Sequence, residues 1–142
     1  MKGLFNFWHA AKTRNNPISL QKLMKQLLHS FQPAAEGNKS FLLNDVPGDF
    51  YVKADENKLA TTIRSLLNKV ISRSTGSCIR LSAKKYNNVI LLYVKETTIN
   101  GRILSSYELT EVQTLAEKMG GCITVNQYRR NATTLTLSFL NQ

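Results

Sequence analysis

ADENKLATTIRSLLNKVISRST, residues 54–75, is the stretch that decides how this chain folds. Its apolar residues recur at helical spacing, which predicts an amphipathic helix with one buried side. Asp55 or Glu56 offers an acceptor for the free amides at the helix start, and Gly76 offers the left-handed conformation that closes a last turn. The polar side is basic and carries Lys58, Arg64, Lys69 and Arg73. The apolar stripe consists of Leu59, Ile63, Leu66, Leu67, Val70 and Ile71.

Around this helix, helical patterns alternate with β-hairpins. Pro17 and Ser19 open a helix that runs to about Gln32, and a third helix spans 109–119, ended by Gly120 and Gly121. The residues 97–107 show no periodicity and are expected to form a loop. The strands are expected at 40–46, 50–54, 78–85, 89–96, 122–128 and 133–140.

This order of elements predicts an α+β fold. Specifically, we expect a two-layer α/β sandwich in which helices cover one face of a mixed, mostly antiparallel sheet. With 142 residues, the chain is long enough for one domain and its core. We assign 17–142 to that domain and 1–16 to an N-terminal segment that is flexible or docks on a partner through Leu4, Phe5, Phe7 and Trp8.

Charge and cysteine content limit the environment and the partners. The 19 basic and 9 acidic residues give a net charge of +10, which favours nucleic acid, an anionic membrane surface or an acidic protein face, or else a solvated basic surface. Cys78 and Cys122 lie in expected strands and are interpreted as buried free thiols of a reducing cytosol. No apolar run approaches the ~20 residues of a membrane span, so we expect a cytoplasmic protein.

Several segments resemble the ATP-binding domain of sensor histidine kinases, the GHKL superfamily. Asp55, Leu59, the pair Leu66-Leu67 and Ile71 match the landmarks of the helix that binds nucleotide in that family. ISLQKLMKQLLHSFQPAAEGN is similar to the linker helix, SCIRLSAKK and VILLYVKE to the central strands, and LAEKMGGCITVNQ to the late helix and strand. The resemblance covers about Pro17 to Phe139 and implies the histidine-kinase ATPase-like (Bergerat) fold.

The resemblance also implies nucleotide-binding side chains that this sequence lacks. Ser65 and Lys69 stand where the family has two asparagines. In the family, the asparagine at the position of Lys69 binds Mg²⁺. A lysine has three donors, no acceptor and a charge that repels the ion. Asn68 is one residue away from that position, and one residue turns a helix by about 100°. Arg73 follows on the same side of the helix and is able to hold an anion without metal.

The expected adenine and phosphate segments differ too. Glu96 aligns with the family's adenine-binding aspartate, but Thr98 and Asn100 replace the glycines that follow it. The phosphate-binding glycines of the lid are replaced by a short segment that contains Ser106 and Glu108, and a carboxylate repels phosphate. Arg130-Asn131-Ala132-Thr133 also replaces a late Gly-x-Gly.

We therefore expect a non-catalytic regulatory or protein-interaction module of two-component-type signalling, a pseudokinase without ATP or Mg²⁺. A response regulator, a kinase or another regulator is the expected partner. The degenerate pocket positions are Ser65, Lys69, Arg73, Glu96, Thr98 and Ser106.

Two alternatives remain: an ATP-binding kinase domain that uses Glu96 for adenine and Lys69 or Arg73 for phosphate, and a basic nucleic-acid-binding module. The chain carries no triad, metal cluster or P-loop. His9 lacks the acidic neighbour of a phosphoacceptor box, and His29 is expected at the helix surface. Too few residues precede the first helix for a helical hairpin that carries a phosphorylated histidine.

Overall fold

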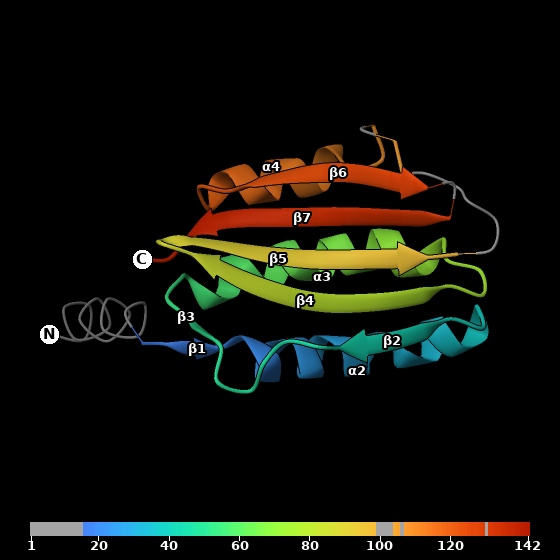
Figure 1. Cartoon of the computed structure of the whole chain (residues 1–142), viewed down its shortest axis with the longest axis horizontal. Helices are drawn as coiled ribbons and strands as arrows, with labels where there is room; N and C mark the ends of the chain where they lie inside the picture. The colour runs from blue at the N-terminus through green and yellow to red at the C-terminus, as the bar shows by residue number, and fades with distance from the viewer. Residues whose placement is uncertain (1–15, 99–103, 106, 130) are drawn as a thin grey trace, which may run out of the picture.

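The computed structural model describes residues 16–98, 104–105, 107–129 and 131–142 (Figure 1). The predicted aromatic N-terminal cluster, His9, Asn100 and Ser106 therefore lie outside the described residues. The helices are α2 (Leu20–Gly37), α3 (Glu56–Ser72) and α4 (Thr110–Lys118). The strands are β1 (Ile18–Ser19), β2 (Phe41–Asn44), β3 (Tyr51–Val52), β4 (Cys78–Tyr86), β5 (Val89–Thr97), β6 (Cys122–Arg129) and β7 (Ala132–Leu140).

Five strands form one sheet in the order β2-β4-β5-β7-β6. The pair β2–β4 is parallel and the other three pairs are antiparallel, while β1 and β3 form a separate short antiparallel pair. All three helices lie behind the same face of the sheet in Figure 1. The structure thus confirms the predicted α/β sandwich and its mixed, mostly antiparallel sheet.

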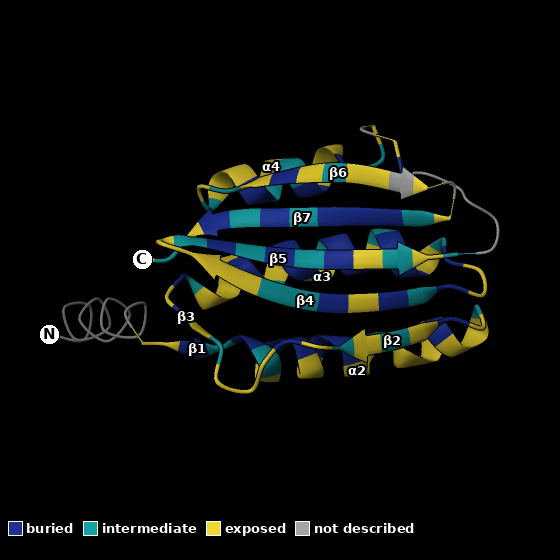
Figure 2. Cartoon of the chain, viewed as in Figure 1, coloured by how far each residue is buried: buried dark blue, intermediate teal, exposed yellow. Residues whose placement is uncertain are grey.

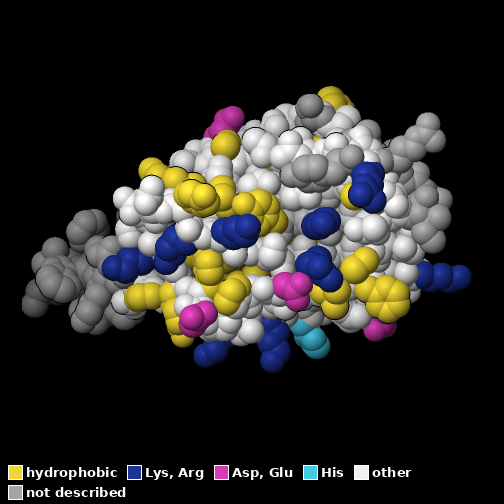
Figure 3. All heavy atoms as spheres, in the orientation of Figure 1, with side chains coloured by type: hydrophobic (Ala, Val, Ile, Leu, Met, Phe, Trp, Pro, Cys, Tyr) yellow, Lys and Arg dark blue, Asp and Glu magenta, His cyan; other side chains and the backbone are white. Residues whose placement is uncertain are grey.

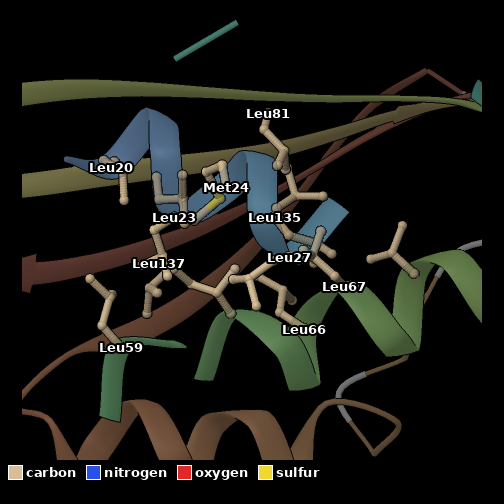
Figure 4. Close-up of a cluster of buried hydrophobic side chains, with 14 of the residues drawn as sticks. Leu20, Leu23, Met24, Leu27, Leu59, Leu66, Leu67, Leu81, Leu135 and Leu137 are labelled. Atoms are coloured by element: carbon tan, nitrogen blue, oxygen red, sulfur yellow. The ribbon is translucent and has the colours of Figure 1, made fainter. Parts of the chain in front are cut away.

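The core lies between this sheet face and the helices. Leu66 and Leu67 of α3 are fully buried, and Figure 4 shows them in one cluster with Leu23 of α2 and Leu135 of β7. Strand alternation places Ile90 and the other buried residues of β5 on the helix side (Figure 2). Burial of this apolar area supplies most of the favourable free energy of folding.

The ends of α3 follow the expected chemistry. The Asp55 side chain accepts a hydrogen bond from the Lys58 backbone N–H at 3.2 Å and so caps the helix. Gly76 has the predicted left-handed conformation, with φ of 58°. Its N–H donates to the Asn38 carbonyl at 3.0 Å, so this glycine joins the loop after α3 to the end of α2.

Several predictions of element boundaries were wrong. Helix α2 continues through Pro33 to Gly37, beyond the predicted end near Gln32. A proline removes one backbone donor, but Ala34 and Ala35 after it are strong helix formers, and Ala35 is fully buried. Strand β2 is shorter than predicted, because the chain leaves the sheet after the Asp45 N–H donates to the Leu81 carbonyl at 2.8 Å. Strand β3 is also shorter than the predicted 50–54, and it pairs with β1, which the sequence did not predict.

Two smaller predictions concern single side chains. Neither cysteine is fully buried as predicted: Cys78 is half-buried, and Cys122 is exposed on the outer face of the sheet with its Sγ 3.1 Å from the Ser138 Oγ. His29 is exposed on α2, as predicted. None of the helices in the described ranges is long and apolar enough to cross a membrane.

Candidate functional site

The polar side of α3 carries three of the predicted pocket positions. Ser65, Lys69 and Arg73 follow one another at intervals of about one helical turn, so they share one side of the helix. All three are half-buried, and Arg73 is the C-cap residue. This side of α3 therefore presents one hydroxyl and two cations, with no carboxamide at these positions.

Glu96 lies near the end of β5 and points to the helix side of the sheet. Its Oε2 accepts a hydrogen bond from the Ser77 hydroxyl at 2.9 Å. Burial raises the pKa of Glu96 above its ordinary value of 4.5, and the Ser77 hydrogen bond and the positive charge of Arg73 oppose that rise. The carboxylate expected to meet adenine is thus already bound within the chain.

Arg73 joins α3 to the segment that leads into α4. Its guanidinium lies 3.4 Å from the Glu108 Oε2, and the Arg73 side chain is only 14% exposed. The same Glu108 oxygen accepts a hydrogen bond from the Ser105 N–H at 2.8 Å. Glu108, which we expected to repel phosphate, is therefore an internal anion that pairs with the predicted anion-binding arginine.

Thr98 marks the place where the family resemblance implies a glycine. Its N–H donates to the Asn131 carbonyl at 2.9 Å, which connects the end of β5 to the turn before β7. Its hydroxyl lies 3.5 Å from the Thr75 carbonyl oxygen, in the loop after α3. The backbone after β5 is thus held by neighbouring loops at the point where the family's glycines approach nucleotide.

A set of serines beside Glu96 was missed by the sequence reasoning. The Ser40 hydroxyl donates to the Ser74 Oγ at 2.8 Å and accepts from the Ser77 N–H at 3.1 Å. The Ser74 hydroxyl in turn donates to the Ile71 carbonyl at 2.7 Å. These bonds connect the ends of α2 and α3 to the start of β4, and the only sequence signal for them is the serine-rich stretch between α3 and β4.

The arrangement brings together Arg73, Glu96 and Glu108, together with Ser77. Every buried side-chain nitrogen and oxygen in the part of the chain that the structure describes has a hydrogen-bond partner. In the same residues, no group of three His, Cys, Asp or Glu is placed to hold a metal ion. We call Arg73, Ser77, Glu96, Ser105 and Glu108 the polar cluster. Its charged groups are arranged to bind one another.

Two surface hollows lie apart from the polar cluster. One of about 160 Å³ lies where Asp55 and Lys58 of α3 approach the C-terminal residues Leu140 and Gln142. The other, of about 730 Å³, lies along α2 and reaches Asn44 of β2. Neither hollow is lined by Ser65, Lys69, Arg73 or Glu96.

Comparison with known proteins places this geometry in a fold class. No protein-family model and no curated protein sequence matches the chain. Solved structures do: the chain has the fold of the catalytic domains of sensor histidine kinases.

Among the matching structures, the histidine kinase AdeS of Acinetobacter baumannii gives a TM-score of 0.77 at 12% identity, over 89% of this chain and 67% of that one. The catalytic domain of the histidine kinase ThkA gives 0.73 at 11% identity, over 89% of this chain and 95% of that one. ThkA in complex with the response regulator TrrA gives 0.71 at 13% identity, over 99% of this chain and 49% of that one. The predicted histidine-kinase ATPase-like fold is confirmed.

Proposed function

We propose that this chain is a non-catalytic histidine-kinase ATPase-like domain that acts by binding another protein of a signalling pathway. In this proposal, binding of ATP with Mg²⁺ has been lost and the fold has been kept. The observation that carries it is the polar cluster. Glu96, in the place of the adenine-binding carboxylate, accepts a hydrogen bond from Ser77. Arg73, the residue best placed to bind an anion, pairs with Glu108.

Two further features support the loss of nucleotide. A ligand phosphate that approaches Arg73 has either to displace the Glu108 carboxylate or to lie beside its negative charge. The Ser105 N–H also donates a hydrogen bond to this carboxylate. Such displacement leaves the partly exposed Glu108 carboxylate without its cation, which costs free energy. Lys69 in the place of the Mg²⁺-binding asparagine adds a positive charge where the metal ion is required.

If nucleotide binding is lost, binding to another protein is the function that this fold still supports. The solved complex of ThkA with TrrA is an example of a histidine kinase of this fold bound to a response regulator. We extend that kind of partner to this chain and propose a response regulator, a kinase or another regulator. The net charge of +10 favours a partner with an acidic surface.

Titration calorimetry with ATP and with ADP, each with and without Mg²⁺, tests the loss of nucleotide binding. We expect no binding in the micromolar range by the full chain, beside a histidine-kinase catalytic domain that binds Mg²⁺-ATP as a positive control. Micromolar affinity for either nucleotide contradicts the proposal. If binding occurs, a Glu96→Ala variant then shows whether this carboxylate holds adenine, as the alternative of an atypical ATP-binding domain requires.

A further inference from the structure

One whole face of the five-stranded sheet lies opposite the helices. Because side chains alternate along a strand, the residues that flank Ile79, Leu81 and the other buried residues of β4 point away from the helices. We call this side the open face. Figure 3 looks onto it, with the described helices behind the sheet.

The charges that the strands themselves carry on the open face are all positive. The only acidic residue within the seven strands is Glu96, and it points to the helix side. The outward positions carry four exposed basic side chains: Arg80, Lys84 and Lys95 near the middle of the face, and Arg129 of β6 at its far edge, opposite Ala132. Asp45, just after β2, lies 3.0 Å from Arg80 and is the one acidic group paired with this set among the described residues.

The strand register places Arg80, Lys84 and Lys95 around an apolar centre. Tyr93 of β5 lies opposite Ser82 of β4, so Arg80 and Lys84 lie diagonally on either side of it, and Lys95 lies two residues further along its own strand. Leu91, also half-buried, lies opposite Lys84. In Figure 3, the dark blue basic side chains cross the middle of the face among yellow hydrophobic ones.

Beyond this centre the open face carries one further charge, Arg129 near the end of β6, among mainly hydroxyl-bearing side chains. Tyr93 pairs on its other side with Thr136 of β7, which in turn lies opposite Thr124 of β6. At the other edge of the sheet, Leu43 of β2 lies opposite Arg80 and is 40% exposed. The face therefore combines a basic, partly apolar half with a half that is rich in hydroxyl groups and carries Arg129 at its end.

We propose that the open face binds an acidic protein surface with an apolar centre. Its carboxylates meet Arg80, Lys84 and Lys95, and its apolar side chains cover Tyr93 and Leu91. The inference rests on the proposed function and gives that function a surface. Opposite charges around an apolar centre are the arrangement that fixes orientation and accelerates association at protein interfaces.

The same face is poorly suited to single-stranded nucleic acid. Such ligands stack successive bases on neighbouring aromatic side chains. Here Tyr93 is the one aromatic side chain at the centre, while Phe41 and Tyr86 are 72% and 70% exposed at opposite ends of β4, the first beside its start and the second at its end. The aliphatic residues Leu43 and Leu91 lie opposite Arg80 and Lys84. Aliphatic neighbours of this kind suit contacts with protein side chains better than stacking of bases.

The test combines charge reversal with defined probes. Purified receiver domains of response regulators from the same organism are titrated into the full chain by fluorescence anisotropy, and a labelled oligothymidine is titrated in parallel. The variant is Lys84→Glu with Lys95→Glu. The matched control is Lys25→Glu with Lys58→Glu, which changes the net charge equally on exposed positions of α2 and α3. Thermal melts of all chains establish that each variant is folded.

We expect the open-face variant to bind a receiver domain roughly tenfold or more weakly than wild type, and the control to bind like wild type. A receiver domain bound equally by all three chains overturns the assignment of this surface and leaves the proposed function intact. Oligothymidine binding that only the open-face variant loses, without receiver binding, overturns the protein assignment in favour of nucleic acid. No binding of either probe overturns the assignment of the open face, while the proposed function, which also allows a kinase or another regulator as partner, is tested by the nucleotide calorimetry.

Discussion

The two sides of α3 differ in how strictly the fold constrains their side chains. On the buried side, Leu59, Ile63 and Leu66 and their neighbours in the stripe are fully buried, so this side determines how the helix packs. On the polar side, Arg73 binds Glu108 of the same chain, and Lys69 stands where the family resemblance implies an asparagine. Packing constrains the first side tightly, whereas the chemistry of the second can change without loss of the fold.

The same contrast is present along β5. Ile90, Leu92 and Val94 alternate into the core, and Glu96 continues that inward series at its polar end. The apolar members need only volume and shape, but a half-buried carboxylate needs a partner. Ser77 supplies it, so the inward side of β5 ends in a bond within the chain.

The largest effect is expected on the buried side of α3. Leu66→Ala should lower the free energy of unfolding by about 3 kcal/mol, because it leaves a cavity between α2, α3 and the sheet. Urea denaturation followed by circular dichroism measures the change. The exposed Arg64→Ala on the same helix is the control and should change stability by less than about 0.5 kcal/mol. A loss in Leu66→Ala as small as in the control would contradict the assignment of this stripe to the core.

A smaller effect is expected on the polar side. Arg73→Ala should lower the free energy of unfolding by about 1 kcal/mol, because Glu108 and Glu96 lose the cation beside them. Lys69→Ala, one turn earlier, should change it by less than about 0.5 kcal/mol. Urea denaturation of both variants measures this difference.

The sign of the Arg73→Ala effect distinguishes two roles for the polar side. A stability loss supports an internal ion pair that belongs to the fold. If Arg73→Ala is instead more stable than wild type, the arginine is a strained residue kept for a ligand, as binding residues often are. That result would favour the alternative of an atypical ATP-binding domain and would weaken the contrast between the two sides of α3.

The smallest effect is a pH dependence at Glu96. Because its pKa is raised in the folded state, the folded chain binds this proton more tightly than the unfolded chain does. The stability that this group contributes is therefore fully present below the unfolded value of 4.5 and is lost as pH rises through the folded pKa. Glu96→Gln, which keeps an acceptor for Ser77, should lack this part of the decline.

Thermal melts of wild type and Glu96→Gln across mildly acidic to neutral pH measure the difference. The two curves should diverge as pH rises, with Glu96→Gln the more stable at neutral pH. Parallel curves would mean that burial does not perturb this carboxyl. Glu96 would then be free to meet a ligand, contrary to our reading of the polar cluster.

Local patterns were sufficient to predict most of the fold. The stripe of α3, its Asp55 cap and the hairpin turn at Asn87 follow from spacing and turn chemistry, and Asn87 has the positive φ of 54° that such a turn requires. Pro33 misled the prediction, because a proline inside a helix is judged locally as an end. Burial of Ala35 against the core decides otherwise.

The candidate site was less predictable, because its bonds join distant segments. The resemblance put Arg73 and Glu96 in one region, and both lie in the polar cluster. The bond of Ser77 to Glu96 and the pairing of Arg73 with Glu108 depend on how the end of α3, two strands and the approach to α4 converge. No periodicity or spacing in the sequence encodes that convergence.

The parallel pairing of β2 with β4 has a consequence for the order in which the fold assembles. A parallel pair cannot be closed by a tight turn, and here the chain between the two strands includes all of α3. The hairpins β4–β5 and β6–β7 need only short loop closures and are able to form early. Pairing of β2 with β4 has to close the longer loop that contains α3, so we expect this parallel edge of the sheet to form after the two hairpins.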